Sequence, residues 1–347
     1  MQPLLALTMG DACGIGPEII ARLFRSGEAG GCVVLGDVAV MRRAAAFTGG
    51  MLAVAELGSV ADAAQVPPMC IPVLPVAGLP ADLIDAPVGR IDARAGAAAA
   101  RCIEQAVTLV HDGAVSGIVT APIHKEALAA AGIGYPGHTE MLQALDAPGA
   151  SAPPPVRMML ANDQLRTVLV TIHLSLRRAI DAITCESVLE TIRIAHAAAA
   201  RWGQPQPRIA VAGLNPHAGE GGLFGDEEIR LIAPAIDAAR AEGIAVSGPY
   251  APDTVFMRAR HAPPAHPGEF DIVVAMTHDH GLIPVKYLGV EQGVNVTLGL
   301  SFVRTSPDHG TAFDLAGSGR ADASSLAAAV RMARRLVAGV SASSVPP

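Results

Sequence analysis

The sequence predicts an α/β fold with mostly parallel strands. Short apolar runs rich in Val, Ile and Leu alternate with stretches of helical periodicity along almost the whole chain of 347 residues. Gly, Pro, Asn and Asp, which favour turns, stand between the two kinds of segment. This alternation is typical of strand–helix–strand units, whose strands pair in parallel and end at one edge of the sheet.

The individual elements follow from where turn residues interrupt the apolar pattern. Pro17 suits the first turn of a helix, and Asp226 is a good N-cap for a later one. The Ala-rich segment 93–110 is interrupted by charged and polar residues, which indicates an amphipathic helix. The expected strands, in order, are 4–8, 32–35, 117–120, 167–172, 209–212 and 272–276. The expected helices are 17–24, 38–47, 93–110, 124–131, 185–202, 226–242 and 322–337.

Loops and domain borders are signalled by composition. Residues 66–89 and 146–155 are rich in proline and are expected to be loops. A chain of this length can hold two domains. We expect one domain built from both chain ends, residues 1–130 with 295–347, and a second built from the middle, residues 131–294.

The composition narrows the class of protein. With 51% apolar residues the chain can bury a large core, but no apolar run is long enough to span a membrane. The net charge of −7, the absence of a basic run and the 3% aromatic content disfavour nucleic-acid binding. The five cysteines are scattered without a CxxC pair, and the N-terminus lacks a signal-peptide pattern, so we expect a cytoplasmic protein.

Three histidines each follow a strand-like run. His173 follows 167–172, His278 follows 272–276, and His217 follows 209–212 within a turn-forming Asn-Pro-His-Ala-Gly segment. Strand ends are where α/β proteins place their chemistry. Three imidazoles would leave an open position on zinc or another borderline divalent ion, and Asp279 could orient its neighbour His278. The alternative is three unrelated histidines that are hydrogen-bonded in the core.

Several polar groups could bind an anion. His138 and Thr139 precede a helical run, so they could bind an anionic substrate at a helix N-terminus, or Thr139 could simply cap that helix. Arg304 follows an apolar run, where a cation needs an anion such as phosphate or carboxylate. Lys286 and Asn295 lie in or beside the same apolar region, although Lys286 could be an ordinary surface lysine.

Two loops could approach a cofactor. Residues 10–18 form a Gly-rich strand-to-helix junction that is not GxGxxG, so a standard Rossmann dinucleotide site is not supported. This junction is either a plain turn or part of an active-site wall. Residues 308–317 form a loop that enters a short helical turn, with backbone amides available to a ligand; a helix cap is the alternative.

Taken together, the motifs resemble the 4-hydroxythreonine-4-phosphate dehydrogenase family over nearly the whole chain and in the family's order. The matching segments are Gly-Ile-Gly-Pro-Glu at 14–18, Gly-His-Thr-Glu at 137–140, Asn-Pro-His-Ala-Gly-Glu at 215–220, Pro-Asp-Thr at 252–254, His-Asp at 278–279, Gly-Val-Asn-Val-Thr-Leu-Gly at 293–299, Arg-Thr-Ser at 304–306 and Asp-His-Gly-Thr-Ala at 308–312. The Gly-rich and His-Gly-Thr-Ala loops also resemble the wider isocitrate and isopropylmalate dehydrogenase fold.

The resemblance implies a two-domain subunit with its site in the interdomain cleft, acting as a homodimer. It implies that His173, His217 and His278 bind a divalent metal whose ligands come from both subunits. Zinc is the first choice, and Mg, Mn or Co are the alternatives. The implied substrate-binding residues are His138, Thr139, Lys286, Asn295 and Arg304. The implied residues against NAD are His309, Gly310, Thr311 and Asp314.

The resemblance also implies a reaction, namely NAD-dependent oxidation of a secondary alcohol in a phosphorylated 3-hydroxy acid, with decarboxylation of the product. Asp253, Asp279 and Lys286 are the candidates for the general base. The segment Gly-Leu-Ile-Pro-Val-Lys at 281–286 looks closer to a catabolic branch acting on 4-phosphorylated threonate or erythronate. Residues 9–11 and His280, which stands where glutamine is usual, also depart from the biosynthetic members, so both kinds of substrate stay open. The alternatives are a cis-dihydrodiol dehydrogenase of an aromatic dicarboxylate such as terephthalate dihydrodiol, and a non-catalytic metal- or phosphate-binding protein on the same fold.

Overall fold

The structure is a computed structural model that describes residues 3–343, and the chain divides into two compact units. Unit 1 comprises the described residues up to Pro155 together with Leu300–Val337, and unit 2 comprises Val156–Gly299 with the described residues from Ala338 on. The first border therefore lies after Pro155 and not at residue 130. The reason is that Asp146 is tied into unit 1, since its carboxylate accepts a hydrogen bond from the Ser301 amide (2.7 Å) and pairs with His111 Nε2 (3.0 Å).

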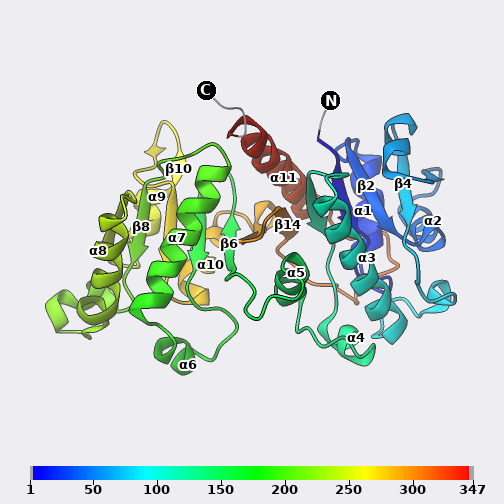
Figure 1. Ribbon diagram of the computed structural model, residues 1–347. Helices are drawn as coiled ribbons and strands as arrows, with labels where there is room; N and C mark the ends of the chain where they lie inside the picture. The colour runs from blue at the N-terminus through cyan, green and yellow to red at the C-terminus, as the bar shows by residue number, and fades with distance from the viewer. Residues whose placement is uncertain (1–2, 344–347) are drawn as a thin grey trace. The chain divides into compact units, whose positions relative to one another are not determined.

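Unit 1 contains a parallel sheet with the strand order β3-β4-β2-β1-β5-β14 (Figure 1). Helices α1, α2 and α3 contact these strands. The strands are β1 (Leu5–Thr8), β2 (Cys32–Gly36), β3 (Ala53–Glu56), β4 (Cys70–Pro75), β5 (Gly117–Thr120) and β14 (Val303–Pro307). The helices are α1 (Gly16–Arg25), α2 (Val38–Phe47), α3 (Ala93–His111), α4 (Lys125–Ala130) and α5 (His138–Asp146), and α11 (Ser324–Ser343) begins in this unit.

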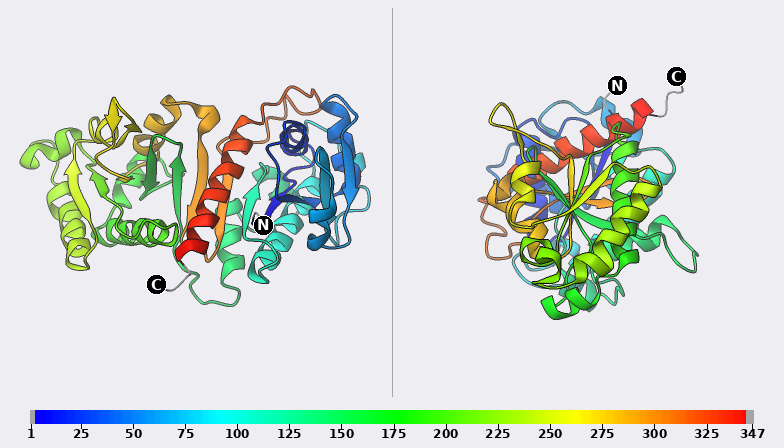
Figure 2. Two further views of the ribbon diagram at one scale, coloured as in Figure 1. Left: turned by 90° about the horizontal axis from the view of Figure 1, so that it is seen from above. Right: turned by 90° about the vertical axis from the view of Figure 1, so that its left-hand side faces the viewer.

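Unit 2 contains a mixed sheet with the order β13-β6-β7-β12-β8-β9, in which β6 pairs antiparallel with both of its neighbours. Helices lie on both sides of its strands, α7 and α8 on one side and α9 and α10 on the other (Figure 2). The strands are β6 (Arg157–Ala161), β7 (Arg166–Leu169), β8 (Ile209–Ala212), β9 (Val246–Tyr250), β12 (Ile272–Ala275) and β13 (Val294–Leu298). The helices are α6 (Leu176–Asp181), α7 (Cys185–Arg201), α8 (Ala233–Ala241), α9 (Val255–Ala259) and α10 (His278–Tyr287).

The predicted α/β class with mostly parallel pairing is confirmed, but one expected loop was wrong. The expected loop 66–89 contains β4, whose apolar Ile71 and Val73 are buried in spite of the neighbouring prolines, and β4 pairs with β2 and β3. Asp226 stands directly before the helical residues that lead through a π-helical turn, Glu228–Ile232, into α8, and its carbonyl accepts hydrogen bonds from the Ile229 and Arg230 amides. The helix start expected there is confirmed, although the Asp226 carboxylate pairs with Arg230. The alternative that Thr139 caps its helix is excluded, because α5 begins at His138 with Gly137 as its N-cap.

Two further expectations concern the cysteines and membrane-spanning helices. Four of the five cysteines are buried, as expected of small core residues, and Cys185 is half-buried at the start of α7. Over residues 3–343, no helix combines the length and the apolar character that a membrane crossing requires.

Candidate active site

The three predicted histidines lie at the carboxyl ends of three neighbouring parallel strands. His173 follows β7, His217 lies in the turn after β8, and His278 opens α10 after β12. Because β12 pairs in parallel with both β7 and β8, the three strand ends share one edge of the unit 2 sheet. The strand-end placement predicted from the apolar runs is therefore confirmed for all three residues.

His173 and His278 face each other across a pocket of about 210 Å³. Their ring centroids are 5.9 Å apart. Two imidazoles on one zinc have centroids roughly 5 Å apart, because the Zn–N bonds are about 2.0 Å long and the geometry is tetrahedral. His278 Nδ1 is 2.7 Å from Asp279 Oδ1, and this contact leaves Nε2 as the nitrogen available to an ion. The separation of the two rings is therefore somewhat larger than that of two imidazoles on one ion.

His217 lies in an adjacent pocket of about 790 Å³, which it shares with Asp253, Asp279 and His280. Asp279 lines both pockets and so connects the surroundings of His217 with those of the His173–His278 pair. Within the described part of the chain, however, no three His, Cys, Asp or Glu side chains come close enough together to hold an ion. A single chain therefore assembles two of the three predicted ligands and holds the third one pocket away.

His280, whose role the sequence leaves open, contributes a half-buried imidazole to the pocket of His217. Burial lowers the pKa of this imidazole. Its Nδ1 is buried and has no hydrogen-bond partner among residues 3–343. His280 is therefore a polar group of the candidate site and not a surface substitution.

Unit 1 contains a buried arginine, Arg304, whose side chain reaches a polar residue at the end of a neighbouring strand. Arg304, only 2% exposed, is the second residue of β14 and donates to the hydroxyl of Thr120 at the end of β5, at 2.7 Å from Nη2. The apolar run before Arg304 does not form a strand that ends there, since β14 begins only at Val303 and contains Arg304. Burial lowers the pKa of Arg304 to about 10, so the guanidinium remains a cation at neutral pH.

His138 and Thr139 open helix α5 in the same unit. Burial, and then the charge of Arg304, hold the pKa of His138 well below its usual range, so the imidazole is neutral. A neutral imidazole, a hydroxyl and a buried guanidinium beside the N-terminus of a helix form a chemically suitable set for phosphate or carboxylate. The remaining predicted substrate residues belong to unit 2, where Lys286 is exposed in the last turn of α10 and Asn295 is half-buried in β13.

The predicted cofactor loop, which carries His309, Gly310, Thr311 and Asp314, is an irregular segment after β14. It is fastened to the first strand-to-helix junction, because Ile15 N donates to Thr311 O (3.0 Å) and the buried Glu18 carboxylate accepts hydrogen bonds from the amides of Gly317 and Gly319. The two loops that the sequence singled out therefore form one structure.

Two residues beside these loops were missed by the sequence reasoning. Asp11 is fully buried, and burial raises the pKa of its carboxyl to about 6. His124 stacks on Phe313 with ring centroids 4.8 Å apart. Asp11 Oδ2 and His124 Nδ1 are buried without a hydrogen-bond partner in the described residues. Their position just beyond the ends of β1 and β5 was the available signal, and it was applied only to the histidines of unit 2.

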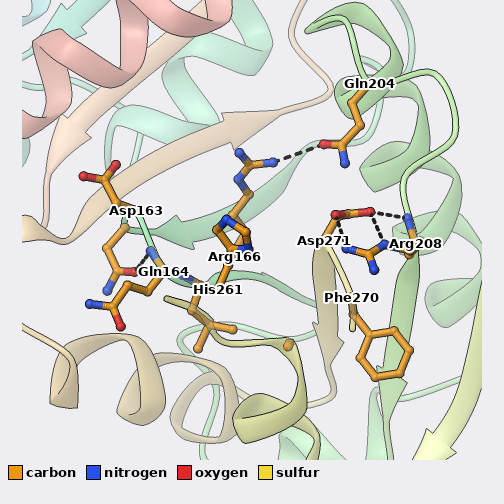
Figure 3. A pocket seen from close by; sticks show the side chains of 11 residues that line it. Asp163, Gln164, Arg166, Gln204, Arg208, His261, Phe270 and Asp271 are labelled. Atoms are coloured by element: carbon orange, nitrogen blue, oxygen red, sulfur yellow. Dashed lines mark hydrogen bonds and ion pairs between the residues drawn. The ribbon is translucent and has the colours of Figure 1, made fainter. Parts of the chain in front are cut away.

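Another pocket of unit 2, of about 220 Å³, lies at the opposite ends of the same strands (Figure 3). Polar side chains of this pocket bind one another, since Arg208 pairs with Asp271 (2.9 Å) and Arg166 donates a hydrogen bond to Gln204 (3.2 Å). None of the predicted site residues lines it. The three predicted histidines therefore lie at the opposite edge of the unit 2 sheet from this pocket.

Comparison with known proteins identifies the family. Residues 28–333 match the model of the pyridoxal phosphate biosynthetic protein PdxA family. A 4-hydroxythreonine-4-phosphate dehydrogenase of Beijerinckia indica is 55% identical over 335 residues, which cover 96% of this chain and 94% of the relative. A D-threonate 4-phosphate dehydrogenase of Pectobacterium atrosepticum is 43% identical over 349 residues, which cover 97% and 100%.

Solved structures agree with this assignment. A 4-hydroxythreonine-4-phosphate dehydrogenase from Klebsiella pneumoniae matches with a TM-score of 0.84 at 42% identity, covering 96% of this chain and 99% of that one. A terephthalate 1,2-cis-dihydrodiol dehydrogenase from Burkholderia xenovorans matches less closely, with a TM-score of 0.65 at 31% identity and coverage of 96% and 98%. The resemblance stated from the motifs is confirmed: the chain belongs to the pyridoxal phosphate biosynthetic protein PdxA family, and the relatives named above are dehydrogenases.

Proposed function

We propose that this protein is an NAD-dependent and divalent-metal-dependent dehydrogenase that oxidises the secondary alcohol of a phosphorylated 3-hydroxy acid. The observation that carries the proposal is the His173–His278 pair, with Asp279 on His278, at the strand edge that also holds His217. The names of the relatives support the reaction class and the phosphorylated substrate. In this proposal unit 2 supplies the metal-binding groups, and unit 1 supplies Arg304 and the predicted cofactor loop.

The donor set of His173, His217 and His278 suits zinc, with Mg, Mn or Co as alternatives, and the ion would lower the pKa of the substrate hydroxyl and stabilise charge on its oxygen. Asp279 holds His278 in the orientation that such binding needs. His217 would complete the ligand set in a homodimer whose subunits share the site. Exposed apolar side chains around His217, namely Met257, Ile283 and Tyr287, support such a contact between subunits.

The proton of the substrate hydroxyl needs an acceptor. Asp253 lines the pocket of His217, whereas Asp279 is already engaged with His278. Lys286 belongs to neither of the two histidine pockets. Of the three candidates for the general base, the geometry therefore favours Asp253.

The phosphate would be held by Arg304 with His138 and Thr139, assisted by Lys286 and Asn295. Binding energy gained at this distant group would orient the reacting carbon. NAD would lie against the loop that carries His309, Gly310, Thr311 and Asp314, with its nicotinamide ring receiving the hydride. The resulting 3-oxo acid would lose CO₂, which makes the product a phosphorylated ketone. The substrate would be 4-hydroxythreonine 4-phosphate or 4-phosphothreonate, the two kinds of phosphorylated acid for which the relatives are named.

The dihydrodiol reaction remains the second candidate, because the 31% identical Burkholderia structure is named for it. In that reaction Arg304 would hold a carboxylate in place of the phosphate. The higher identity of this chain to relatives named for phosphorylated substrates favours the first proposal.

NADH production by the zinc-loaded protein tests the proposal. We would compare 4-hydroxythreonine 4-phosphate, 4-phosphothreonate and terephthalate cis-dihydrodiol at equal concentration. Arg304→Ala is expected to lower kcat/KM for the phosphorylated acid by roughly 10- to 100-fold, since a charge-assisted hydrogen bond contributes about 1.5–3 kcal/mol. Arg331→Ala, at an exposed arginine paired with Glu28, is the control and should leave turnover unchanged. Turnover of the dihydrodiol alone would contradict the phosphate proposal.

A further inference from the structure

The segment that carries His217 has an unusual backbone. His217, Ala218 and Glu220 have φ values of 54°, 52° and 43°, and the intervening Gly219 and the following Gly221 are also left-handed. Residues with a Cβ avoid this region because Cβ crowds the following carbonyl oxygen. Three such residues so close together persist only where the surroundings fix the backbone, and strain of this kind concentrates at functional sites.

One buried carboxylate provides that fixation. Glu228 is 2% exposed, and its Oε1 accepts hydrogen bonds from the amides of Leu214 and Asn215, both at 2.7 Å. Its Oε2 accepts a third from Asn215 Nδ2 at 3.0 Å. These are charge-assisted bonds to the residues immediately before Pro216 and His217, so they set the direction in which the chain enters the left-handed segment.

The loop is shaped around this carboxylate. A Cβ at Gly213 would lie 3.0 Å from Glu228 Oε1, and a Cβ at Gly219 would lie 2.8 Å from Oε2. Glycine at these two positions lets the backbone close on the carboxylate from both sides. Removal of the carboxylate would leave two partly buried amides without their acceptor.

Glu228 also occupies an unusual backbone element. It is the first residue of the π-helical turn Glu228–Ile232 that leads into α8. Such turns are uncommon and occur frequently at functional sites. The neighbouring Glu227 reaches only the side chain of Asn215, at 2.7 Å from Oε2 to Nδ2, and accepts neither loop amide. Of the two adjacent glutamates, Glu228 therefore binds backbone amides of the loop and Glu227 binds only a side chain, which makes Glu227 a matched control.

We propose that Glu228 is a positioning residue for His217: its carboxylate holds the left-handed loop in the one conformation that presents the imidazole to a divalent ion. Glu228 acts through His217 and does not itself touch substrate or metal. The proposal rests on the proposed role of His217 as a metal ligand. It predicts that loss of the Glu228 charge weakens metal binding only as long as His217 is present.

The test is a double-mutant cycle on zinc affinity, measured by competition with a chromogenic chelator in the full-length protein. Glu228→Gln places an amide NH₂ among hydrogen-bond donors and is expected to weaken zinc binding by about 10- to 100-fold, as for other partners of metal ligands. In a His217→Ala background the same change should have no further effect. Glu227→Gln, the control, should change the affinity by less than about 2-fold. An equal loss from Glu228→Gln in both backgrounds would overturn the proposal.

Hydrogen exchange at the Leu214 and Asn215 amides separates this inference from the metal assignment. Glu228→Gln should speed their exchange whether or not zinc is bound, and unchanged protection would overturn the positioning role. If His217→Ala leaves zinc affinity at the wild-type value while these amides still depend on Glu228, the metal role of His217 fails and the loop contact stands. Glu228→Asp, which keeps the charge on a shorter side chain, gives the same readouts if the glutamine variant does not fold, with an intermediate loss expected.

Discussion

At the scale of single residues, Asp11 is the clearest case in which burial opposes the ordinary state of a side chain. Its Oδ1 accepts a hydrogen bond from the Cys13 amide at 2.8 Å, whereas its Oδ2 is buried without a partner among residues 3–343. Burial outweighs the favourable amide contact and raises the pKa to about 6. Above that pH the folded state holds a poorly compensated negative charge.

Asp11→Asn should therefore stabilise the protein at pH 7.5. The folded-state pKa of about 6 lies above the model value of 3.8, so the stabilisation that comes from the protonated carboxyl is full below about pH 4 and is lost as the pH rises through 6. Asparagine keeps the acceptor for Cys13 and does not titrate. The gain in unfolding free energy should grow between pH 4 and 6 to at most about 3 kcal/mol. Urea unfolding at pH 4.5 and 7.5 measures it, and a gain that does not depend on pH would contradict the account.

The placement of the three predicted histidines at strand ends was predictable from the sequence, and their grouping in space was not. His173, His217 and His278 could be recognised because each follows an apolar run, and that signal depends only on neighbours in the sequence. Which strands are adjacent depends on contacts between distant residues. The position of His217 one pocket away from His173 and His278 could not be read from the spacing.

At the scale of elements, α3 and α4 pack against each other through a helical glycine. A Cβ at Gly96 would lie 2.0 Å from the carbonyl oxygen of Ala127 and 2.8 Å from Leu128 N. Both contacts are with backbone, which cannot swing aside as a flexible side chain can. The close approach of α4 to α3 therefore requires glycine at this position.

Gly96→Ala tests this contact against helix propensity. Propensity alone predicts a gain of about 1 kcal/mol from alanine in a helix. The clash predicts the opposite, a loss of roughly 1–3 kcal/mol, because α4 must move away. Gly30→Ala, at a site with no atom within 4 Å of the added Cβ, is the control. Urea midpoints decide between the two, and a variant as stable as the wild type or more so would show that the two helices do not constrain each other.

Helices were easier to predict than strands. The expected helix 38–47 coincides with α2, and 185–202 differs from α7 only at its end, because these segments repeat an apolar pattern over several turns. Strands β3, β4, β6, β9, β13 and β14 and the two-residue strands β10 and β11 were not among the expected strands. They are short and are stabilised by pairing with other strands, so a local pattern carries little of the information.

At the scale of the whole molecule, the proposed functional groups are divided between the two units. Unit 1 carries Arg304, His138 and the predicted cofactor loop, and unit 2 carries the three histidines. The motifs that carry the family resemblance come from both units, which is why the resemblance extends over nearly the whole chain. The separation predicts that a loss in one unit leaves the other unit's binding intact, so that Arg304→Ala should bind zinc normally.

The most direct measurement is to follow zinc content and NADH production together in the same preparation. The protein would be treated with a chelator, titrated back with zinc and assayed with 4-phosphothreonate and NAD, alongside His173→Ala. The account predicts that activity disappears with the metal and returns in proportion to the zinc bound, and that His173→Ala binds zinc weakly and stays inactive at zinc levels that restore the wild type. Full NADH production by the metal-free protein, or by His173→Ala without bound zinc, would contradict it.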